Sequence, residues 1–528
     1  MMKNTSRSVV NAAAFRQFST PASSRKVAVL GGGVAGLQMA RSLKARGIDP
    51  IVYEGTSHIG GVWAKNYVGF GVQVPKQLYE FPDFPMTSTA RGVFPSGPEV
   101  QAYVHDFADA FKLKESVRLN TQVQKLERRA DGKPGWTVTT TSSTGGSAPT
   151  VTEMADVDFA VVATGMYSSA NPNLPAFEGA EAFPGSVLHS SQYLDSALAK
   201  GKHVVVVGGG KSAADIACDA SDVAESSTYL FRNPHWATPR KIAGLIPFQY
   251  VFLSRFGQQL VSLFKGGWPS APAGTHAFHS LLKWPMRPVF GLVELLFALQ
   301  NGTLPWSSRS AWRSGDVVKD FYGFAQVLTT DLKDRISSGL VTATRGEIVK
   351  LNSTDPCTAE LSDGRTVPCD LVVCATGFKK DYSVFPEDVL AALNVEADGL
   401  WLYRHTVPPR VADLAFCGSE VATISNIATY ALQAEWICEM MLASGDGVGD
   451  ESLPSPEAML TSVEEHKEWA RSWMPDTPSR AALVLLHQVH FHDRLLKDLG
   501  VGHRRKAPDL LAEAFMPYEP ADYDGIVK

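Results

Sequence analysis

Three glycines near the start of the chain have the spacing of a turn that binds phosphate. Gly31, Gly33 and Gly36 follow the apolar run 27–30 and precede a segment with helical periodicity, in the order G-x-G-x-x-G. The first glycine permits a tight turn, the second lets a pyrophosphate approach the backbone, and the third lets helix and strand pack closely. The helix N-terminus favours the phosphates through its free N–H groups and its dipole. The next predicted strand ends at Glu54, where a carboxylate can bind a ribose hydroxyl.

The same pattern occurs a second time, and its details favour a different dinucleotide. Gly208 and Gly210 follow a run of four valines, and Ala213 takes the third position, a replacement that this motif permits. Arg232 falls where the first site has Glu54, and a guanidinium there can pair with a 2′-phosphate. The second site is therefore expected to bind NADPH rather than NADH. The alternative is that Arg232 is an ordinary surface arginine at a strand end.

The elements around the two motifs repeat as well. Each motif is followed by a predicted hairpin with an Asp-Gly turn, and then by a strand that ends in Ala-Thr-Gly, at 163–165 and 375–377. Lys211 and Ser212, which open the second helix, are expected to contact the second cofactor. The order of elements predicts an α/β fold with two Rossmann-like, three-layer domains, a helical insertion and a helical C-terminal tail.

The composition is that of an ordinary globular protein. The 528 residues are 45% hydrophobic with a formal net charge of −5, which provides no basic field for nucleic acid. Six cysteines do not make a disulfide-rich secreted framework, so we expect an intracellular, reducing compartment. Residues 1–26 are basic and contain no acid, which is typical of a mitochondrial transit peptide or of a disordered tail. Cytoplasm and mitochondrion both remain open.

An apolar insertion interrupts the second domain between about residues 241 and 304. Its most apolar stretches, 244–264 and 288–300, are too short or too interrupted by polar residues to span a bilayer. Buried helices are the first expectation. Peripheral contact with a membrane surface, or an apolar substrate entrance, is the alternative.

Three further segments resemble the flavin-containing monooxygenases. Glu54 to Trp63, which includes Gly61, has that family's pattern E-x-x-x-x-x-G-G-x-W. The segment around Gly418 resembles the one through which the family's chain returns to the flavin. The family's fingerprint, F-x-G-x-x-x-H-x-x-x-Y, stands before the second glycine motif at Phe183, Gly185, His189 and Tyr193.

This resemblance implies FAD in the first domain and NADPH in the second. NADPH would reduce the flavin, and molecular oxygen would add to it as a hydroperoxide. One oxygen atom would then pass to a nucleophilic nitrogen or sulfur of a small, apolar amine or sulfide. Gly61, Trp63 and Gly418 are counted with the cofactor-binding residues on the same basis.

Two candidate catalytic residues also come from the resemblance. Gln73 stands where many members have an Asn that faces flavin and nicotinamide, and Asn426 resembles a family Asn near the flavin. Gln73 is longer than Asn, so release of the bound oxygen as hydrogen peroxide is an open alternative. In that case the protein would be a low-turnover NADPH oxidase or a flavin-binding protein. Oxygenation of a ketone by a Baeyer–Villiger monooxygenase is the nearest alternative. Those enzymes have Pro after the fingerprint where this chain has Leu194, which favours oxygenation of nitrogen or sulfur. His189 is expected either to fix a turn or to touch substrate.

These motifs divide the chain into five parts. They are a tail (1–26), the first part of the FAD domain (27–167), the NADPH domain with its insertion (168–378), the returning FAD segment (379–445) and a helical extension (446–528). The extension is a candidate lid or homodimer contact. Its His487, His490 and His492 do not share one helix face, so we expect no metal site there.

Overall fold

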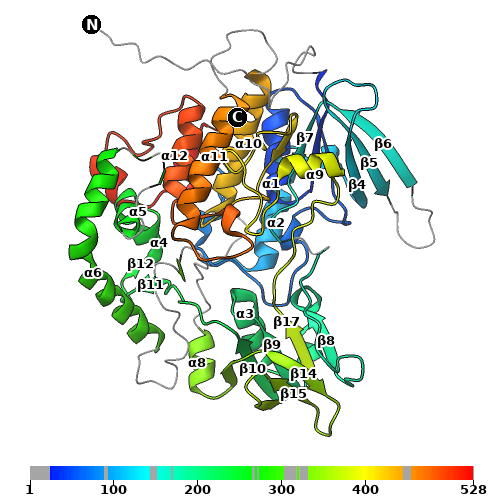
Figure 1. Cartoon of the computed structure of the whole chain (residues 1–528), viewed down its shortest axis with the longest axis vertical. Coiled ribbons are helices and arrows are strands. Elements are labelled where there is room, and N and C mark those ends of the chain that lie inside the picture. The colour runs from blue at the N-terminus through cyan, green and yellow to red at the C-terminus, as the bar shows by residue number, and fades with distance from the viewer. Residues whose placement is uncertain are drawn as a thin grey trace.

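The computed structural model describes residues 24–87, 93–142, 151–167, 171–263, 268–269, 271, 273–302, 317, 320–321, 331–443 and 454–526. The expectation of a basic leader or tail falls almost wholly on residues 1–23, which lie outside these ranges. The predicted α/β class is confirmed, because two parallel sheets form the centre of the molecule, one above the other in Figure 1.

The first sheet consists of short strands, and all but its edge strand β3 are apolar and largely buried on both faces. Its parallel strands lie in the order β18-β7-β1-β2-β3, with bounds β1 (Val27–Leu30), β2 (Pro50–Tyr53), β3 (Val117–Arg118), β7 (Phe159–Val162) and β18 (Leu414–Phe416). Continuous apolar runs are typical of parallel strands covered on both sides. Val27 and Val29 pack with the helices α1 (Val34–Lys44), α2 (Gly97–Ala110) and α10 (Asn426–Ala443). Ala28 and Leu30 pack with the opposite layer, which contains α9 (Glu387–Leu393) and the antiparallel strands β4 (Thr121–Arg128), β5 (Trp136–Ser142) and β6 (Val151–Val157).

The second sheet repeats this plan. Its parallel strands lie in the order β13-β10-β9-β17-β8, with bounds β8 (Ser186–His189), β9 (His203–Val207), β10 (Ser226–Phe231), β13 (Val341–Arg345) and β17 (Leu371–Cys374). One face packs against α3 (Lys211–Ala220) and α8 (Asp331–Ser337). The other face packs against the antiparallel strands β14 (Ile348–Asn352), β15 (Thr358–Leu361) and β16 (Thr366–Pro368).

The insertion and the C-terminal extension lie together at one side of the first domain (Figure 1). The insertion contains β11 (Lys241–Ile242), β12 (Ile246–Pro247), α4 (Phe248–Phe252), α5 (Arg255–Ser262) and α6 (Ala273–Asn301). The extension contains α11 (Pro456–Arg471), α12 (Gln488–Asp498), α13 (Leu510–Phe515) and β20 (Leu483–Leu485), which pairs with β19 (Ala422–Thr423). Among the described residues, no helix has both the length and the apolar character needed to cross a bilayer.

The expectation of buried helices in the insertion is right in part for the first apolar stretch and wrong for the second. Phe248 and Phe252 of α4 and Val261 of α5 are buried. Leu292 and Leu299 of α6 are exposed, because only one side of this helix packs against the protein. An apolar run does not reveal whether both sides of its helix are covered.

Candidate functional site

The two glycine turns have the same construction. Gly31 follows β1 with a φ of +115°, and Gly208 follows β9 with a φ of +147°. A Cβ at Gly31 would lie 2.5 Å from the carbonyl oxygen of Ala163, and one at Gly208 would lie 2.5 Å from that of Ala375. Each position therefore requires glycine for two reasons: its φ is positive, and a side chain would collide with the neighbouring backbone. The Ala-Thr-Gly ends found by sequence are the segments that press against the two turns.

Gly33 and Gly61 face each other across an open backbone surface. A Cβ at Gly33 would lie 3.7 Å from Gly61 Cα, and Gly61 has a φ of +61°. The third glycine, Gly36, lets α1 pack on the turn, since a Cβ there would lie 1.9 Å from the Gly31 carbonyl oxygen. We call the turn 31–36 together with Gly61 the first cradle. It joins a free backbone surface to a helix N-terminus, which is the arrangement that binds phosphate.

Glu54 lies where the sequence predicts it, at the end of β2 beside the first cradle. It is buried, and its Oε2 accepts a hydrogen bond from the Gly32 N–H at 2.8 Å. Its Oε1 accepts one from the Thr56 N–H at 2.9 Å. The two donors fix the carboxylate, whose remaining lone pairs can accept ribose hydroxyls.

The returning segment contacts the first cradle through Gly418. A Cβ at Gly418 would lie 2.6 Å from Ala35 Cβ on α1 and 3.0 Å from the Tyr430 ring. On the other segment, Trp63 meets Tyr79 edge to face, with ring centroids 5.2 Å apart. Burial raises the pKa of both Tyr79 and Tyr430, so they are neutral phenols at physiological pH. These tyrosines were missed from the sequence, because no motif marks them.

The two candidate catalytic residues lie on segments that the fold joins. Gln73 is half-buried in the loop before Leu78, and the Ser425 hydroxyl donates a hydrogen bond to the Leu78 carbonyl oxygen at 2.7 Å. Asn426 is the first residue of α10, and its Oδ1 accepts a hydrogen bond from the Thr423 N–H at 2.9 Å. Asn426 thus organises the start of α10. The catalytic role of both residues stays a prediction.

At the second glycine turn, Gly210 is the N-cap of α3. A cluster of polar side chains joins this helix to the first domain. Lys211 forms an ion pair with Asp215, one turn further along α3. The Tyr67 hydroxyl donates a hydrogen bond to Asp215 Oδ2 at 2.9 Å, and it also bonds with Ser212. Burial raises the pKa of Asp215, and Lys211 opposes that change. Lys211 and Ser212 remain predicted cofactor contacts that the structure places in this cluster.

Arg232 lies with two further arginines at the carboxyl ends of β10 and β13. These residues line a cavity of ≈ 600 Å³ that also includes Glu347, 3.6 Å from Arg232. Arg345 Nε donates a hydrogen bond to the Arg232 carbonyl oxygen at 3.1 Å, and Arg365 donates one to the Arg345 carbonyl oxygen at 2.7 Å. We call Arg232, Arg345 and Arg365 the arginine group. Arg345 could have been found from the sequence, because it is the last residue of the strand that pairs with β10 and so lies at the same sheet edge as Arg232.

The first half of the fingerprint fits the edge strand β8 onto the second sheet. A Cβ at Gly185 would lie 2.2 Å from the Asp370 carbonyl oxygen and 2.5 Å from the Phe183 ring. Phe183 is buried and covers this glycine. The pair therefore explains the spacing F-x-G as close packing beside β17.

The second half of the fingerprint fastens the turn after β8. His189 Nδ1 accepts a hydrogen bond from the Ser191 N–H at 3.2 Å, which leaves Nε2 to donate to the Gly377 carbonyl oxygen at 2.9 Å. Burial lowers the pKa of His189, so the ring is neutral at physiological pH. The Tyr193 hydroxyl donates to Asp219 Oδ2 on α3 at 2.9 Å. Of the two roles expected for His189, these bonds support fixing a turn.

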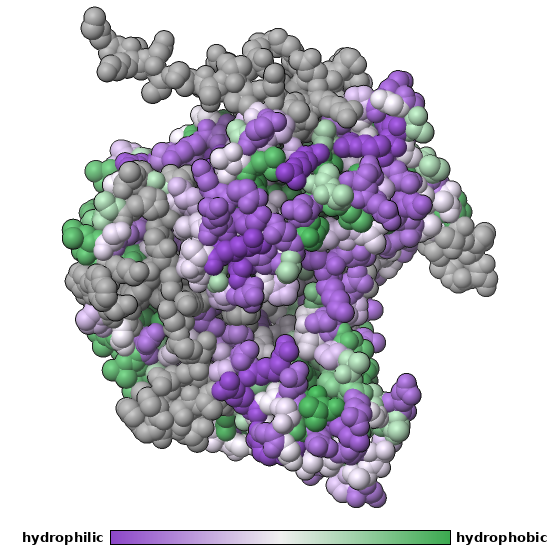
Figure 2. Space-filling model, in the orientation of Figure 1, coloured by the Kyte–Doolittle hydropathy of each residue, from purple (hydrophilic) through white to green (hydrophobic). Residues whose placement is uncertain are grey.

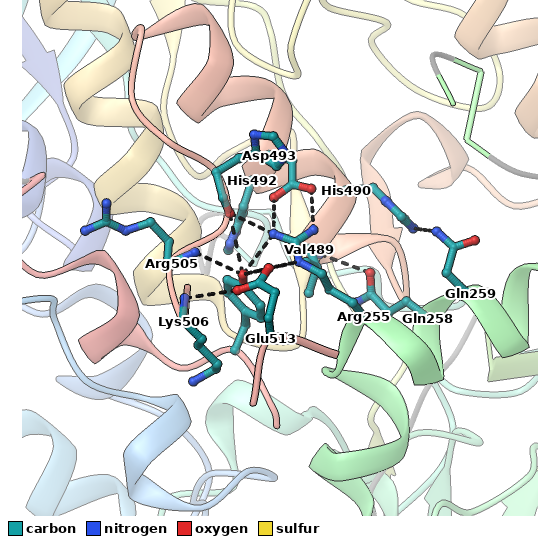
Figure 3. Close-up of polar contacts among 12 residues, drawn as sticks. Arg255, Gln258, Gln259, Val489, His490, His492, Asp493, Arg505, Lys506 and Glu513 are labelled. Carbon is teal, nitrogen blue, oxygen red and sulfur yellow. Dashed lines mark hydrogen bonds and ion pairs between the residues drawn. The ribbon is translucent and has the colours of Figure 1, made fainter. Parts of the chain in front are cut away.

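Arg255 of the insertion binds the C-terminal extension, as Figure 3 shows. Its guanidinium pairs with both carboxylate oxygens of Asp493, at 2.5 and 2.9 Å, and also contacts Glu513 and Tyr518. Burial alone would lower the pKa of Arg255, but the bonds to Asp493 outweigh it and raise the pKa. Buried, paired charges of this kind hold two segments in one position.

The three histidines singled out in the extension lie among polar and aromatic side chains, with His487 and His492 buried and His490 half-buried. His492 lies between the hydroxyls of Thr429 and Tyr523, each 2.7 Å from a ring nitrogen. His490 Nε2 is 3.3 Å from Gln259 of α5, and His487 Nε2 is 3.3 Å from the Ser262 hydroxyl. Across the described ranges, no three His, Cys, Asp or Glu side chains are arranged to hold a metal ion.

A family of known proteins matches the part of the chain that contains both glycine turns. The family model for flavin-binding monooxygenase-like proteins matches residues 24–266 and 318–504. The probable flavin-containing monooxygenase 1 of Arabidopsis thaliana is 26% identical over 545 residues, covering 95% of this chain and 96% of that protein.

Solved structures show the same fold at lower identity. The S-allyl-L-cysteine S-oxygenase of Allium sativum has a TM-score of 0.58 at 20% identity, covering 90% of this chain and 89% of the other. A cyclohexanone monooxygenase mutant from Rhodococcus bound to NADP+ has a TM-score of 0.65 at 16% identity, covering 90% and 97%. The family match spans most of the chain, including both glycine turns and the fingerprint. The chain is a member of the flavin-binding monooxygenase-like family.

Proposed function

We propose that this protein is an NADPH- and oxygen-dependent monooxygenase that oxygenates a nucleophilic nitrogen or sulfur in a small, apolar amine or sulfide. The observation that carries the proposal is the pair of like glycine turns, one beside the carboxylate of Glu54 and the other beside Arg232. A carboxylate suits an unmodified ribose, and arginines suit a phosphorylated one. In the overall reaction, substrate, NADPH, H+ and O2 give the oxygenated product, NADP+ and water.

The first cradle fits FAD. Gly33 and Gly61 leave backbone free for a pyrophosphate, the N-terminus of α1 supplies N–H donors, and Glu54 is held ready for a ribose. The bound flavin supplies electron storage and oxygen activation, which side chains lack. The protein's own part is to bind, orient and exclude water.

The arginine group fits the 2′-phosphate of NADPH. Arg232, Arg345 and Arg365 line one cavity at the strand ends where a second dinucleotide would place its adenosine. Arg345 and Arg365 are held by hydrogen bonds to the neighbouring backbone, so part of the group is already in position. Charge-assisted bonds from guanidinium groups to phosphate are strong and directional.

Water exclusion is the role we assign to the aromatic side chains near the first cradle. Trp63 packs on Tyr79 in the segments after Glu54, and the Tyr430 ring lies beside Gly418 of the returning segment. As neutral phenols, the two tyrosines add no charge that would draw water in. A dry site protects reactive oxygen chemistry from side reactions.

The test uses purified protein with three substrates: a tertiary amine, a thioether and a cyclic ketone. NADPH consumption, oxygenated product and hydrogen peroxide are measured separately. An N-oxide or sulfoxide formed in proportion to NADPH supports the proposal. Product from the ketone alone would indicate a Baeyer–Villiger monooxygenase instead. Peroxide equal to NADPH with every substrate would indicate an oxidase, the outcome that Gln73 leaves open.

A further inference from the structure

The outer side of α6 is apolar and exposed. Phe278, Leu281, Leu292, Leu295 and Leu299 are exposed at spacings that place them on one side of the helix. Leu281 is 76% exposed and Leu292 is 55% exposed. The buried residues His279, Phe297 and Ala298 lie on the other side. A helix on a protein surface normally turns charged or polar residues outward, so this apolar side has no packing partner within the described ranges.

The apolar side of α6 is accompanied by exposed residues of its neighbours. Leu510, Leu511 and Phe515 of α13 are exposed, and the Phe515 ring lies 5.1 Å from the exposed Phe256 ring of α5. His279 of α6 bonds to Gln259 of α5 at 3.0 Å, which places these helices together. We call the exposed apolar residues of α5, α6 and α13 the outer apolar face. Figure 2 shows hydrophobic side chains along the edge of the molecule that α6 occupies in Figure 1. Large exposed apolar patches mark sites of interaction.

Two of the three helices of this face lie outside the part of the chain that matches the family, and only α5 lies within it. The family match omits residues 267–317 and stops at 504, so α6 and α13 both fall beyond it. The bonds of Arg255 to Asp493 and Glu513 fix α5 to the extension that carries α13 (Figure 3). Most of the outer apolar face is thus an addition to the family fold, and the ion pairs of Arg255 hold it in place.

The charge of the insertion indicates what the face contacts. Residues 241–304 contain one acid, Glu294, and five basic residues, of which Arg255 is already paired with acids of the extension. The other four bases leave a formal charge of +3 within a chain of −5; they are Lys241, Lys265, Lys283 and Arg287. An apolar face in a basic segment that cannot span a bilayer is typical of helices that lie in the surface of an anionic membrane. A symmetric dimer through the same face would oppose two basic insertions, which disfavours a second copy as the partner.

We propose that the outer apolar face rests on the surface of an anionic lipid bilayer, with α6 lying along the headgroup region. The helix has 29 residues and is about 43 Å long, so it offers an extended line of contact. Leu281, Leu292 and Leu511 would enter the boundary between headgroups and acyl chains. This inference does not depend on the substrate or reaction under Proposed function.

The test is co-sedimentation of the full chain, with its flavin, with vesicles of phosphatidylcholine alone or mixed with phosphatidylserine. The wild type should pellet with the mixed vesicles, and added salt should weaken this binding more than binding to neutral vesicles. The triple variant Leu281→Gln, Leu292→Gln, Leu511→Gln should lower the bound fraction about tenfold. Flavin content and thermal midpoint are measured alongside. If the triple variant loses its flavin, Leu281→Gln alone provides the test, because that side chain is the most exposed of the three.

A matched control replaces three exposed apolar residues elsewhere: Met154→Gln, Leu174→Gln and Leu340→Gln. It should pellet with the vesicles as the wild type does. Wild-type protein that stays in the supernatant with both vesicle types would overturn the proposal, as would equal losses in the two triple variants. Light scattering that shows a dimer, made monomeric by the α6–α13 variant without any vesicle binding, would assign the face to a second copy and also overturn it.

Discussion

The Tyr67 hydroxyl donates a hydrogen bond to Asp215 Oδ2 across 2.9 Å, and this bond joins the loop after Trp63 to the first turns of α3. The loop belongs to the first domain and the helix to the second. Nearby, the Val68 N–H donates to the Tyr193 carbonyl oxygen at 2.9 Å. The two nucleotide turns are therefore linked through a short series of polar contacts, which can set the position of one cofactor relative to the other.

Tyr67→Phe tests whether that link positions NADPH. The variant keeps the ring and removes the hydroxyl from a buried carboxylate whose Oδ1 has no partner among the described residues. We expect anaerobic reduction of the flavin by NADPH to slow about five- to tenfold, because hydride transfer depends on close alignment, while FAD content stays unchanged. Stopped-flow absorbance measures the rate. Tyr193→Phe is the matched control, since it loses a similar bond to Asp219 within the second domain. Equal slowing in both variants would contradict the positioning role.

Gly33→Val separates folding from cofactor binding. Gly33 has a φ of −77°, which any residue can adopt, and a Cβ there makes an ordinary 3.7 Å contact. The variant should therefore fold, but its methyl groups would fill the first cradle and FAD content should fall at least about tenfold. Circular dichroism and flavin absorbance measure the two properties. Gly502→Val, at an open position, should keep its flavin. Full flavin occupancy in Gly33→Val would rule out this cradle.

Arg232→Ala tests the choice of NADPH over NADH. Loss of a guanidinium that binds the 2′-phosphate should raise the KM for NADPH about tenfold or more, which corresponds to about 1.4 kcal/mol, and leave the KM for NADH nearly unchanged. Arg345→Ala should act in the same direction, because Arg345 lines the same cavity. Arg118→Ala, in the first domain, should change neither value. Equal increases for both nucleotides in Arg232→Ala would remove the phosphate role.

Acid should destabilise the fold through its buried histidines. Burial lowers the pKa of His492 to about 3 and that of His490 and His405 to about 4, below the usual 6.5. The unfolded chain then binds protons that the folded chain does not, so stability is complete above about pH 6.5 and falls as the pH decreases towards 4. Each such histidine contributes up to about 1.4 kcal/mol per pH unit. Thermal midpoints between pH 7.5 and 5 should show this decline.

His492→Gln keeps hydrogen-bonding capacity and removes one titrating group. Its thermal midpoint should be lower than the wild type at pH 7.5, since Thr429 and Tyr523 lose a well-placed partner, but it should decline less steeply with acid. His58→Gln, at an exposed position, should keep the wild-type slope. An unchanged slope in His492→Gln would mean that this ring has the same pKa in the folded and the unfolded protein, and would contradict the prediction.

The sequence was informative where function depends on backbone geometry within a few residues. The glycine turns, the acid at Glu54 and the Asp-Gly hairpins follow local rules, and the structure contains each of them: Gly132 and Gly364 occupy the two hairpin turns with φ of +73° and +82°. The spacing of the fingerprint also had a local cause, although its packing against Asp370 and Gly377 became visible only in three dimensions.

What the sequence did not reveal depends on contacts between distant segments. Tyr67 meets Asp215 across 148 positions, and Arg365 reaches Arg345 only because the hairpin β15–β16 folds back beside β13. No periodic pattern marks such pairs. The exposure of α6 was mispredicted for a related reason, since an apolar run looks the same whether its outer side meets protein or not.

The most direct test of the whole account is the absorbance spectrum of the purified protein before and after anaerobic addition of NADPH. The account predicts a yellow protein with close to one FAD per chain, whose flavin band is bleached by NADPH. A colourless protein that neither releases flavin on denaturation nor takes up added FAD would contradict it.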